Sequence, residues 1–192
     1  MFMLSSQATK NHLSTVSECI KPQYKKKGNM VYLLLTTSYK ENMDIKYKKL
    51  SLNELDVFIE MRINQLREEG AKEKIDLYSY LKDYYLRHMN DGTFVSWLAM
   101  DGERIIGTSG ISFVEKPPYF KCPSGKIGLL SSMFTDSEYR RRGIATELLT
   151  RIVKEAKEYG CGNIQITASN MGVLLYSKFG FVKNNNFMMY NL

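Results

Sequence analysis

Three consecutive arginines, Arg140 to Arg142, run directly into Gly143 and an apolar segment in the stretch YRRRGIATELL. Such a run can form a basic patch for nucleic acid, a solvated charge run at the surface, or a binding site for a phosphate group. The pattern of apolar residues on either side predicts a strand over 126–135 and a helix over 141–160. The arginines therefore lie where a strand ends and a helix begins.

That position favours an anion-binding site. A helix N-terminus presents unpaired backbone N–H groups and about half a positive charge. Glycine lets the backbone approach a bulky anion, and a phosphate group there gains several charge-assisted hydrogen bonds. Positive side chains are unfavourable at a helix N-terminus without a functional reason. The stretch thus has the parts of a pyrophosphate site, although it lacks the glycine spacing of the two common phosphate-binding motifs.

The charge of the chain, +7 in total, is unevenly distributed. Residues 1–42 carry six lysines and two glutamates, a net +4, and residues 43–192 hold 21 basic and 18 acidic residues, a net +3. The larger segment is only mildly basic, and its aromatic residues are not interleaved with the arginine run. This composition suits a small anionic ligand and is weak support for binding nucleic acid.

The cysteines and the hydropathy pattern indicate a cytoplasmic protein. Cys19, Cys122 and Cys161 are odd in number and widely spaced, so neither a metal-ligand motif nor a disulfide framework is expected. No run approaches the roughly 20 apolar residues of a membrane span. The first residues, MFMLSSQATKNHL, make a poor signal peptide.

The elements that must position the arginine stretch follow from residue 43 onward. A Ser51–Glu54 capping box and apolar residues at helical spacing predict a helix over 51–70, and Asp101-Gly102 predicts a hairpin turn. We expect a mixed α/β fold, a mixed sheet with helices packed on it. The expected strands are 43–50, 93–100, 103–114, 126–135, 163–168 and a short pair within 181–192, and the expected helices are 51–70, 75–90, 141–160 and 170–180.

Residues 1–42 are predicted to be an N-terminal appendage to a domain that spans 43–192. They are rich in Ser, Thr, Asn and Lys and show no clear amphipathic period. Residues 39–42 would back-translate to a ribosome-binding sequence before Met43, so Met43 is a candidate natural start. The N-terminal mass of the protein purified from its source tests this, and a mature chain that retains residues 1–42 would contradict it.

Two segments resemble the GNAT superfamily of N-acetyltransferases. MFTDSEYRRRGIATELLTRIVKEAKEYG resembles its acetyl-CoA-binding motif, which is Arg or Gln, two residues, Gly, any residue, and Gly or Ala; Arg140 to Ala145 match it. NIQITASNMGVLLYSKFGF resembles the second signature, a strand, a short helix with a tyrosine, and Gly-Phe. The resemblance covers residues 43–192 and implies a mostly antiparallel mixed sheet, splayed at the cofactor site and flanked by helices.

The resemblance also implies roles for individual residues. The strand before the arginines pairs its backbone with the pantetheine arm of acetyl-CoA, and the backbone from Arg141 to Thr146 holds the pyrophosphate. Ser169 matches a cofactor-contacting asparagine of relatives, and Asn170 beside it is the alternative. Tyr176 matches the tyrosine near the cofactor sulfur, and no metal is implied. The implied cofactor-binding residues are Met133, Phe134, Thr135, Arg140, Arg141, Arg142, Gly143, Ile144, Ala145, Thr146, Ser169 and Asn170.

The implied reaction is direct transfer of an acetyl group from acetyl-CoA to a primary amine. The backbone N–H of Met133 would stabilise the oxyanion, and the Tyr176 hydroxyl would donate to the departing thiolate. The structural alternative for Tyr176 is a ring that packs on the core with its hydroxyl at the surface.

The general base is not identifiable from the sequence. The strand over 126–135 carries Ser131 and Ser132 but no carboxylate. Four carboxylates lie between the first two helices, where one of them could relay a proton through water although surface charge is the more common role: Glu68, Glu69, Glu73 and Asp76. His12 and His88 are expected to be structural or exposed. For Arg62, on the apolar face of the first helix, we favour an internal ion pair over a substrate carboxylate.

The expected partner is a small-molecule or peptide amine, with no nucleic acid and no membrane, and residues 1–42 could serve as a docking arm or a homodimer contact. Two alternative functions stay open. One is an acyl-CoA-binding module without catalysis. The other is a nucleic-acid-binding protein that uses the RRR and KKK runs and binds with a steep salt dependence.

Overall fold

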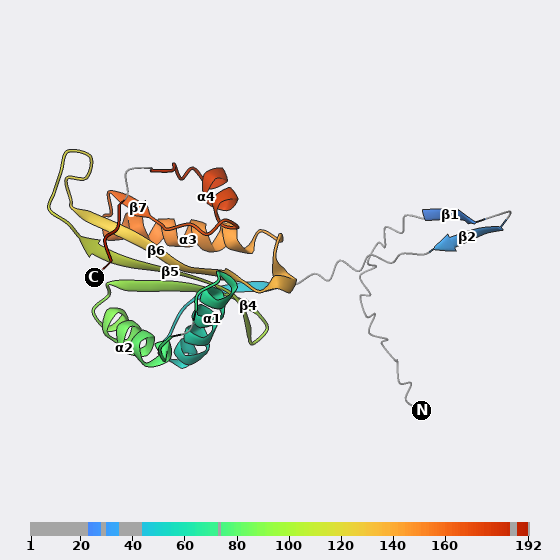
Figure 1. Cartoon of the computed structure of the whole chain (residues 1–192), viewed down its shortest axis with the longest axis horizontal. Coiled ribbons are helices and arrows are strands. Elements are labelled where there is room, and N and C mark those ends of the chain that lie inside the picture. Colours follow the sequence, from blue (N-terminus) through green and yellow to red (C-terminus); the bar gives the residue numbers. More distant parts are fainter. Residues whose placement is uncertain (1–22, 28–29, 35–43, 73, 185–187, 192) are drawn as a thin grey trace, which may run out of the picture. The chain divides into compact units, whose positions relative to one another are not determined.

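A computed structural model describes residues 23–27, 30–34, 44–72, 74–184 and 188–191 (Figure 1). The chain divides into two compact units, residues 1–42 and 43–192. In the first unit, β1 (Gln23–Lys27) pairs antiparallel with β2 (Met30–Leu34). The sequence did not predict this hairpin. The candidate start, Met43, and His12 lie outside the described residues.

The second unit is built on a five-stranded sheet in the order β3-β4-β5-β6-β7. Its first four strands pair antiparallel, and β6 and β7 pair parallel. Asp101 pairs with Arg104, which leaves a two-residue hairpin turn with Gly102 at φ +57°, as the Asp-Gly dipeptide predicts. The strands are β3 (Ile45–Lys49), β4 (Phe94–Asp101), β5 (Arg104–Glu115), β6 (Lys126–Thr135) and β7 (Asn163–Gln165).

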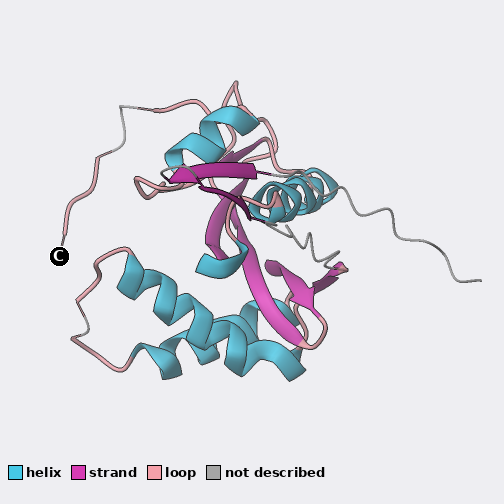
Figure 2. Ribbon diagram, turned by 90° about the vertical axis from the view of Figure 1, so that its right-hand side faces the viewer, coloured by secondary structure: helices cyan, strands magenta, loops and turns pink. Residues whose placement is uncertain are grey.

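Helices cover both faces of this sheet, so the expected mixed α/β fold is confirmed. Helices α1 (Leu55–Glu68) and α2 (Leu77–Asn90) lie on one face, and α3 (Ile144–Tyr159) and α4 (Val173–Phe179) lie on the other (Figures 1 and 2). One buried cluster, which includes Phe58, Tyr85 and Phe94, joins α1 and α2 to the sheet. On the opposite face, α3 buries Leu149 and Ile152 against β5 and β6.

Helix α3 is the element that positions the arginine stretch. Its buried side chains recur at helical spacing and form one face: Ile144, Leu148, Leu149, Ile152 and Ala156. Both ends are glycines with φ of +85°, Gly143 at the N-cap and Gly160 at the C-cap. This left-handed conformation carries no steric cost for glycine, which explains the sharp turns into and out of the helix.

Two expected features differ from the structure. The strand expected over 163–168 ends at Gln165. The strand pair expected within 181–192 is wrong for the described residues, 181–184 and 188–191, which form no strand. Val182, Met188 and Tyr190 are about 90% exposed. Apolar and aromatic residues favour strands when they can pack on a half-buried sheet surface. In the described part of this segment no neighbouring strand provides such a surface.

Candidate functional site

Strand β6 is bulged in its middle and unpaired along part of one edge. Thr108 pairs with Phe134 and Gly110 with Ser131, so Ser109 alone faces both Ser132 and Met133. This arrangement is a β-bulge, and Ser132 has a φ of +51°. β7 pairs only with residues 127–129, so within the described chain the next six residues of β6 have no strand partner on that side. An extended ligand could add to this open edge.

The bulge is held by side chains from two neighbouring elements. The Thr108 hydroxyl on β5 donates to the carbonyl of Ser132 at 2.8 Å. The Tyr85 hydroxyl on α2 lies 3.3 Å from the Ser132 hydroxyl. Thr108 and Ser132 are almost completely buried. These contacts fix the bulge from both sides, so the direction of the backbone at Met133 is set before any ligand binds.

After β6 the chain turns sharply into the N-terminus of α3. Arg141 has a φ of +62° and Gly143 a φ of +85°, both left-handed. Arg140 holds the turn to the strand, because its Nε donates to the Thr135 carbonyl at 2.9 Å and its guanidinium pairs with Glu68 at 2.6 Å. The turn therefore leads the chain into the N-terminus of α3, where backbone N–H groups can bind an anion.

The β6 edge, this turn and helix α4 border one cavity of about 780 Å³. Most of the cofactor-binding residues expected from the sequence line it together: Met133, Phe134, Thr135, Arg140, Arg141, Gly143, Ile144, Ala145, Thr146 and Ser169. Tyr176 lines it as well. Two expected residues, Arg142 and Asn170, are not among the lining residues. Arg142 instead lies over the Tyr139 ring, 5.4 Å from its centroid. The Ser169 hydroxyl accepts a hydrogen bond from the Gly172 N–H at 3.3 Å, at the start of α4.

Tyr176 on α4 faces the cavity with a largely buried side chain. Within the described chain its hydroxyl has no hydrogen-bond partner. Burial raises the pKa of Tyr176 to about 12, and the negative charge of Glu69 adds to the rise. Gly172 makes room for the ring, because a Cβ at that position would lie 2.7 Å from Tyr176 Cε2. The hydroxyl is thus protonated at neutral pH and available to a ligand.

Helix α1 contributes a row of polar residues that the sequence did not reveal as a unit. Arg62 Nη1 donates to Gln65 Oε1 at 2.9 Å, and Gln65 Nε2 donates to Glu69 Oε1 at 3.1 Å. All three residues line the cavity. Their spacing of three and four places them on one helical face. This spacing was the only sequence signal that could have identified the row.

The internal ion pair favoured for Arg62 is wrong for the described residues. Among those residues, the Arg62 guanidinium hydrogen-bonds the neutral amide of Gln65, and no carboxylate forms an ion pair with it. Gln65 is not charged, so it orients the guanidinium without neutralising it.

The carboxylates that could act as the base differ in their surroundings. Glu68 pairs with Arg140, and the Asp76 carboxylate accepts the Tyr78 N–H at the start of α2. Glu73 lies outside the described residues. Glu69 alone of the described three lines the cavity without an ion pair. His88 hydrogen-bonds Thr93 through Nδ1 at 2.6 Å and does not line the cavity, so its position is structural.

Among the described residues, no group of three or more His, Cys, Asp or Glu side chains could hold a metal ion. Cys122 and Cys161 are free thiols there, whereas Cys19 lies outside the described part. None of the described helices is long and apolar enough to cross a membrane.

The sequence and the fold both resemble known acetyltransferases. The family model described as Acetyltransferase (GNAT) family matches residues 59–181. N-alpha-acetyltransferase MAK3 of Arabidopsis thaliana is 38% identical over 133 residues, which is 68% of this chain and 64% of that protein. N-acetyltransferase 8B of Rattus norvegicus is 29% identical over 115 residues, 58% of this chain and 50% of that protein. The chain therefore spans about half to two thirds of the length of these relatives.

A crystal structure from Clostridium acetobutylicum, described as a predicted acetyltransferase with acetyl-CoA, matches this chain with a TM-score of 0.74 and 31% identity. The match covers 77% of this chain and 96% of that chain. The similarity thus extends over nearly the whole of a solved protein.

Proposed function

Since the chain belongs to the acetyltransferase (GNAT) family, we propose that it transfers an acetyl group from acetyl-CoA to a primary amine of a small molecule or peptide. The observation that carries the proposal is the course of β6. The strand is bulged and unpaired along one edge, and it runs directly into the left-handed turn at the N-terminus of α3. One cavity joins these features to the hydroxyl of Tyr176.

The residues present fit acetyl-CoA. The open edge of β6, from Met133 to Thr135, offers backbone groups to an extended pantetheine arm. The backbone from Arg141 to Thr146 offers N–H groups and the positive end of the α3 dipole to a pyrophosphate. Ser169 lines the cavity and is favoured over Asn170 as the contact from the β7–α4 connection. Acetyl-CoA would supply the activated acetyl thioester.

Each catalytic role falls to a group that the fold already orients. The bulge directs the Met133 backbone, whose N–H would stabilise the oxyanion that develops at the acetyl carbonyl. The Tyr176 hydroxyl, protonated at neutral pH, would donate its proton to the departing thiolate. The Glu69 carboxylate, fixed by Gln65, is the base we assign to take the proton from the acceptor ammonium, directly or through a water molecule.

The alternatives predict different behaviour. An acyl-CoA-binding module would bind cofactor without consuming it, and a nucleic-acid-binding protein would ignore free CoA and bind with a steep salt dependence. Free thiols at Cys122 and Cys161 support the cytoplasm as the compartment. A homodimer contact through residues 1–42 stays a proposal.

The test is an acetyl-transfer assay. Purified protein is incubated with acetyl-CoA and a panel of primary amines, including peptides with free N-termini, and free CoA and the acetylated product are measured together. Product that forms in equal amount with CoA supports the proposal. CoA release without acetylated product, or neither, would count against it, because direct transfer must produce both.

A further inference from the structure

We propose that Arg62 forms an anion-binding subsite beside the reacting centre, so that the acceptor is an amine that also carries a carboxylate or a phosphate group. The inference rests on the proposed acetyl transfer and names the class of acceptor for that same site. Arg62 lines the cavity, has no counter-ion in the described part of the chain, and lies apart from the pyrophosphate site.

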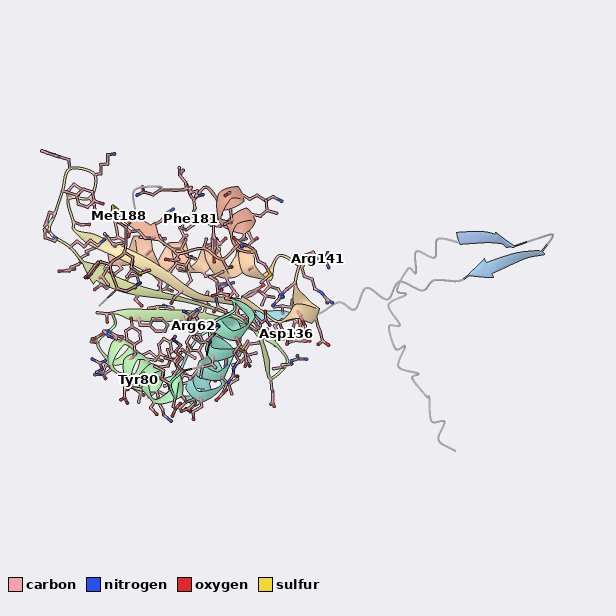
Figure 3. The ribbon with its side chains drawn as sticks, in the orientation of Figure 1. Arg62, Tyr80, Asp136, Arg141, Phe181 and Met188 are labelled. Carbon is pink, nitrogen blue, oxygen red and sulfur yellow. The ribbon has the colours of Figure 1, made fainter. Side chains whose placement is uncertain are left out.

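Arg62 lines the cavity that the bulge borders. It lies on the side of α1 that faces the sheet (Figure 3) and lines the cavity together with Ser131, Ser132 and Met133. The positive charge of Arg62 acts on Tyr85, which contacts the bulge. Burial raises the pKa of Tyr85, whose hydroxyl contacts Ser132, and the positive charge of Arg62 opposes that rise. The guanidinium is therefore close to the place where the acetyl group and the amine would meet.

The guanidinium has a fixed orientation and spare donors. Gln65 is buried, and its amide nitrogen donates to Glu69, so its oxygen must face Arg62. That oxygen accepts one of the five N–H donors of the guanidinium. Because no carboxylate pairs with Arg62 in the described part of the chain, its half-buried charge is uncompensated. A half-buried charge is costly without a partner, and an anion in the cavity would supply one.

The phosphates of acetyl-CoA are not that partner. Arg140 marks the pyrophosphate end of the site, where it binds the carbonyl of Thr135. Ser132 lies three residues earlier on β6, about 10 Å back along an extended strand. Arg62 thus lies towards the thioester end, where acetyl-CoA is uncharged, and the acceptor is the ligand that can bring an anion there.

The charges of Arg62 and Glu69, at the two ends of the row on α1, indicate which groups the acceptor carries. A guanidinium fork matches the geometry of a carboxylate or a phosphate and can bind either through two hydrogen bonds. Glu69, at the other end of the row, attracts the ammonium group of the acceptor. An amine with an anionic group satisfies both ends, whereas a polycationic amine would be repelled by Arg62.

The experiment compares acceptors that differ only in the anion. Wild-type protein with acetyl-CoA is assayed with α-amino acids against their carboxamides, and with a phosphorylated amino sugar against the unphosphorylated sugar. We expect the anionic member of at least one pair to be favoured by about tenfold or more in kcat/KM. The pair that shows the preference identifies the source as carboxylate or phosphate. Equal kcat/KM within every pair, or preference for the neutral members, would overturn the proposal.

Variants assign the preference to Arg62. In Arg62→Gln the preference should disappear through a rise in KM for the anionic member alone, while acetyl-CoA affinity stays within about twofold. Gln65→Glu should have the same effect by giving Arg62 an internal counter-ion at almost unchanged volume. Arg87→Gln is the matched control, because Arg87 lies on α2 and hydrogen-bonds its own helix at Asp83. Equal losses for both members of a pair would mean that Arg62 is only structural.

A binding measurement separates failure of this inference from failure of the proposed function. The Nε–Hε NMR signal of Arg62, identified by its loss in Arg62→Lys, is followed in the acetyl-CoA complex during titration with acetate, inorganic phosphate or chloride. A saturable shift with acetate or phosphate supports the subsite even where no tested amine is acetylated. No shift with either anion overturns the subsite, whereas acetyl transfer to neutral amines would leave the proposed function intact.

Discussion

Tyr176 illustrates how one side chain acquires a role from its surroundings. Thirteen tyrosines occur in the chain, so residue type alone carries no information. What distinguishes Tyr176 is a buried ring, made possible by Gly172, and a hydroxyl that faces the cavity without a partner in the described structure. With its pKa raised to about 12 by burial and by Glu69, it can donate a proton at neutral pH but cannot act as a base.

Tyr176→Phe should therefore lower kcat and leave cofactor binding intact. We expect a loss of about 100-fold, within the usual range for a positioned proton donor, because the thiolate must then leave unprotonated. Steady-state kinetics gives kcat, and calorimetry gives the dissociation constant of acetyl-CoA. A variant with full kcat would contradict the role and would fit a tyrosine that only packs on the core.

The raised pKa of Tyr176 also predicts a pH dependence of stability. Its hydroxyl ionises near the ordinary value of 10.0 in the unfolded chain and near 12 in the folded one. The stabilisation is complete below pH 10, and it is lost as the pH rises towards 12 because the unfolded state releases the proton first. We expect the free energy of unfolding to fall more steeply between pH 10 and 12 in wild type than in Tyr176→Phe, because this window lies between the unfolded and folded pKa values of Tyr176. Urea denaturation at a series of pH values measures this. The same change in the free energy of unfolding with pH in both proteins would contradict the prediction.

At the scale of elements, the two ends of α3 have the same backbone conformation and different surroundings. Gly143 and Gly160 both have a φ of +85°. An added Cβ would meet nothing within 4 Å at Gly143 and only the Lys126 side chain, at 4.0 Å, at Gly160. The conformational cost of a side chain is therefore similar at both ends, but only the N-terminal end borders the cavity.

Gly143→Ala and Gly160→Ala should thus separate stability from binding. Each should lower the free energy of unfolding by about 1–2 kcal/mol, the cost of a left-handed non-glycine residue. Only Gly143→Ala should weaken acetyl-CoA binding, by about tenfold, because the turn that presents the backbone N–H groups relaxes. Chemical denaturation and calorimetry measure the two effects. Equal affinities in both variants would show that the α3 N-terminus does not bind the cofactor.

The sequence predicted those parts of the site that lie along one continuous segment. The strand over 126–135 and the start of the helix after Gly143 were predicted correctly, because a strand, a turn and a helix N-terminus are defined by local patterning. The row of Arg62, Gln65 and Glu69 was not predicted as part of the site, because the cavity that it lines is completed by residues of β6 and α4, far along the chain. The strand over 163–168 was predicted, but its end at Gln165 was not, because the length of β7 depends on its pairing with residues 127–129 of β6 and not on the local sequence.

At the scale of the whole molecule, charge distinguishes the competing functions. The chain carries +7, but the unit that contains the cavity carries only +3. Part of the basic charge near the cavity is already neutralised, as in the pair between Arg140 and Glu68. Few phosphate contacts are then available to a polyanion, so nucleic acid should bind weakly. A compact ligand that reaches the N-terminus of α3 is bound by hydrogen bonds from backbone N–H groups as well as by charge.

The most direct test of the cofactor site is a calorimetric titration of the full chain with acetyl-CoA at two salt concentrations. We predict one site with a dissociation constant near micromolar, about −8 kcal/mol, that weakens only modestly as salt rises because directed backbone hydrogen bonds share the binding. Absence of binding at both concentrations would contradict the assignment of β6 and the α3 N-terminus as a cofactor site.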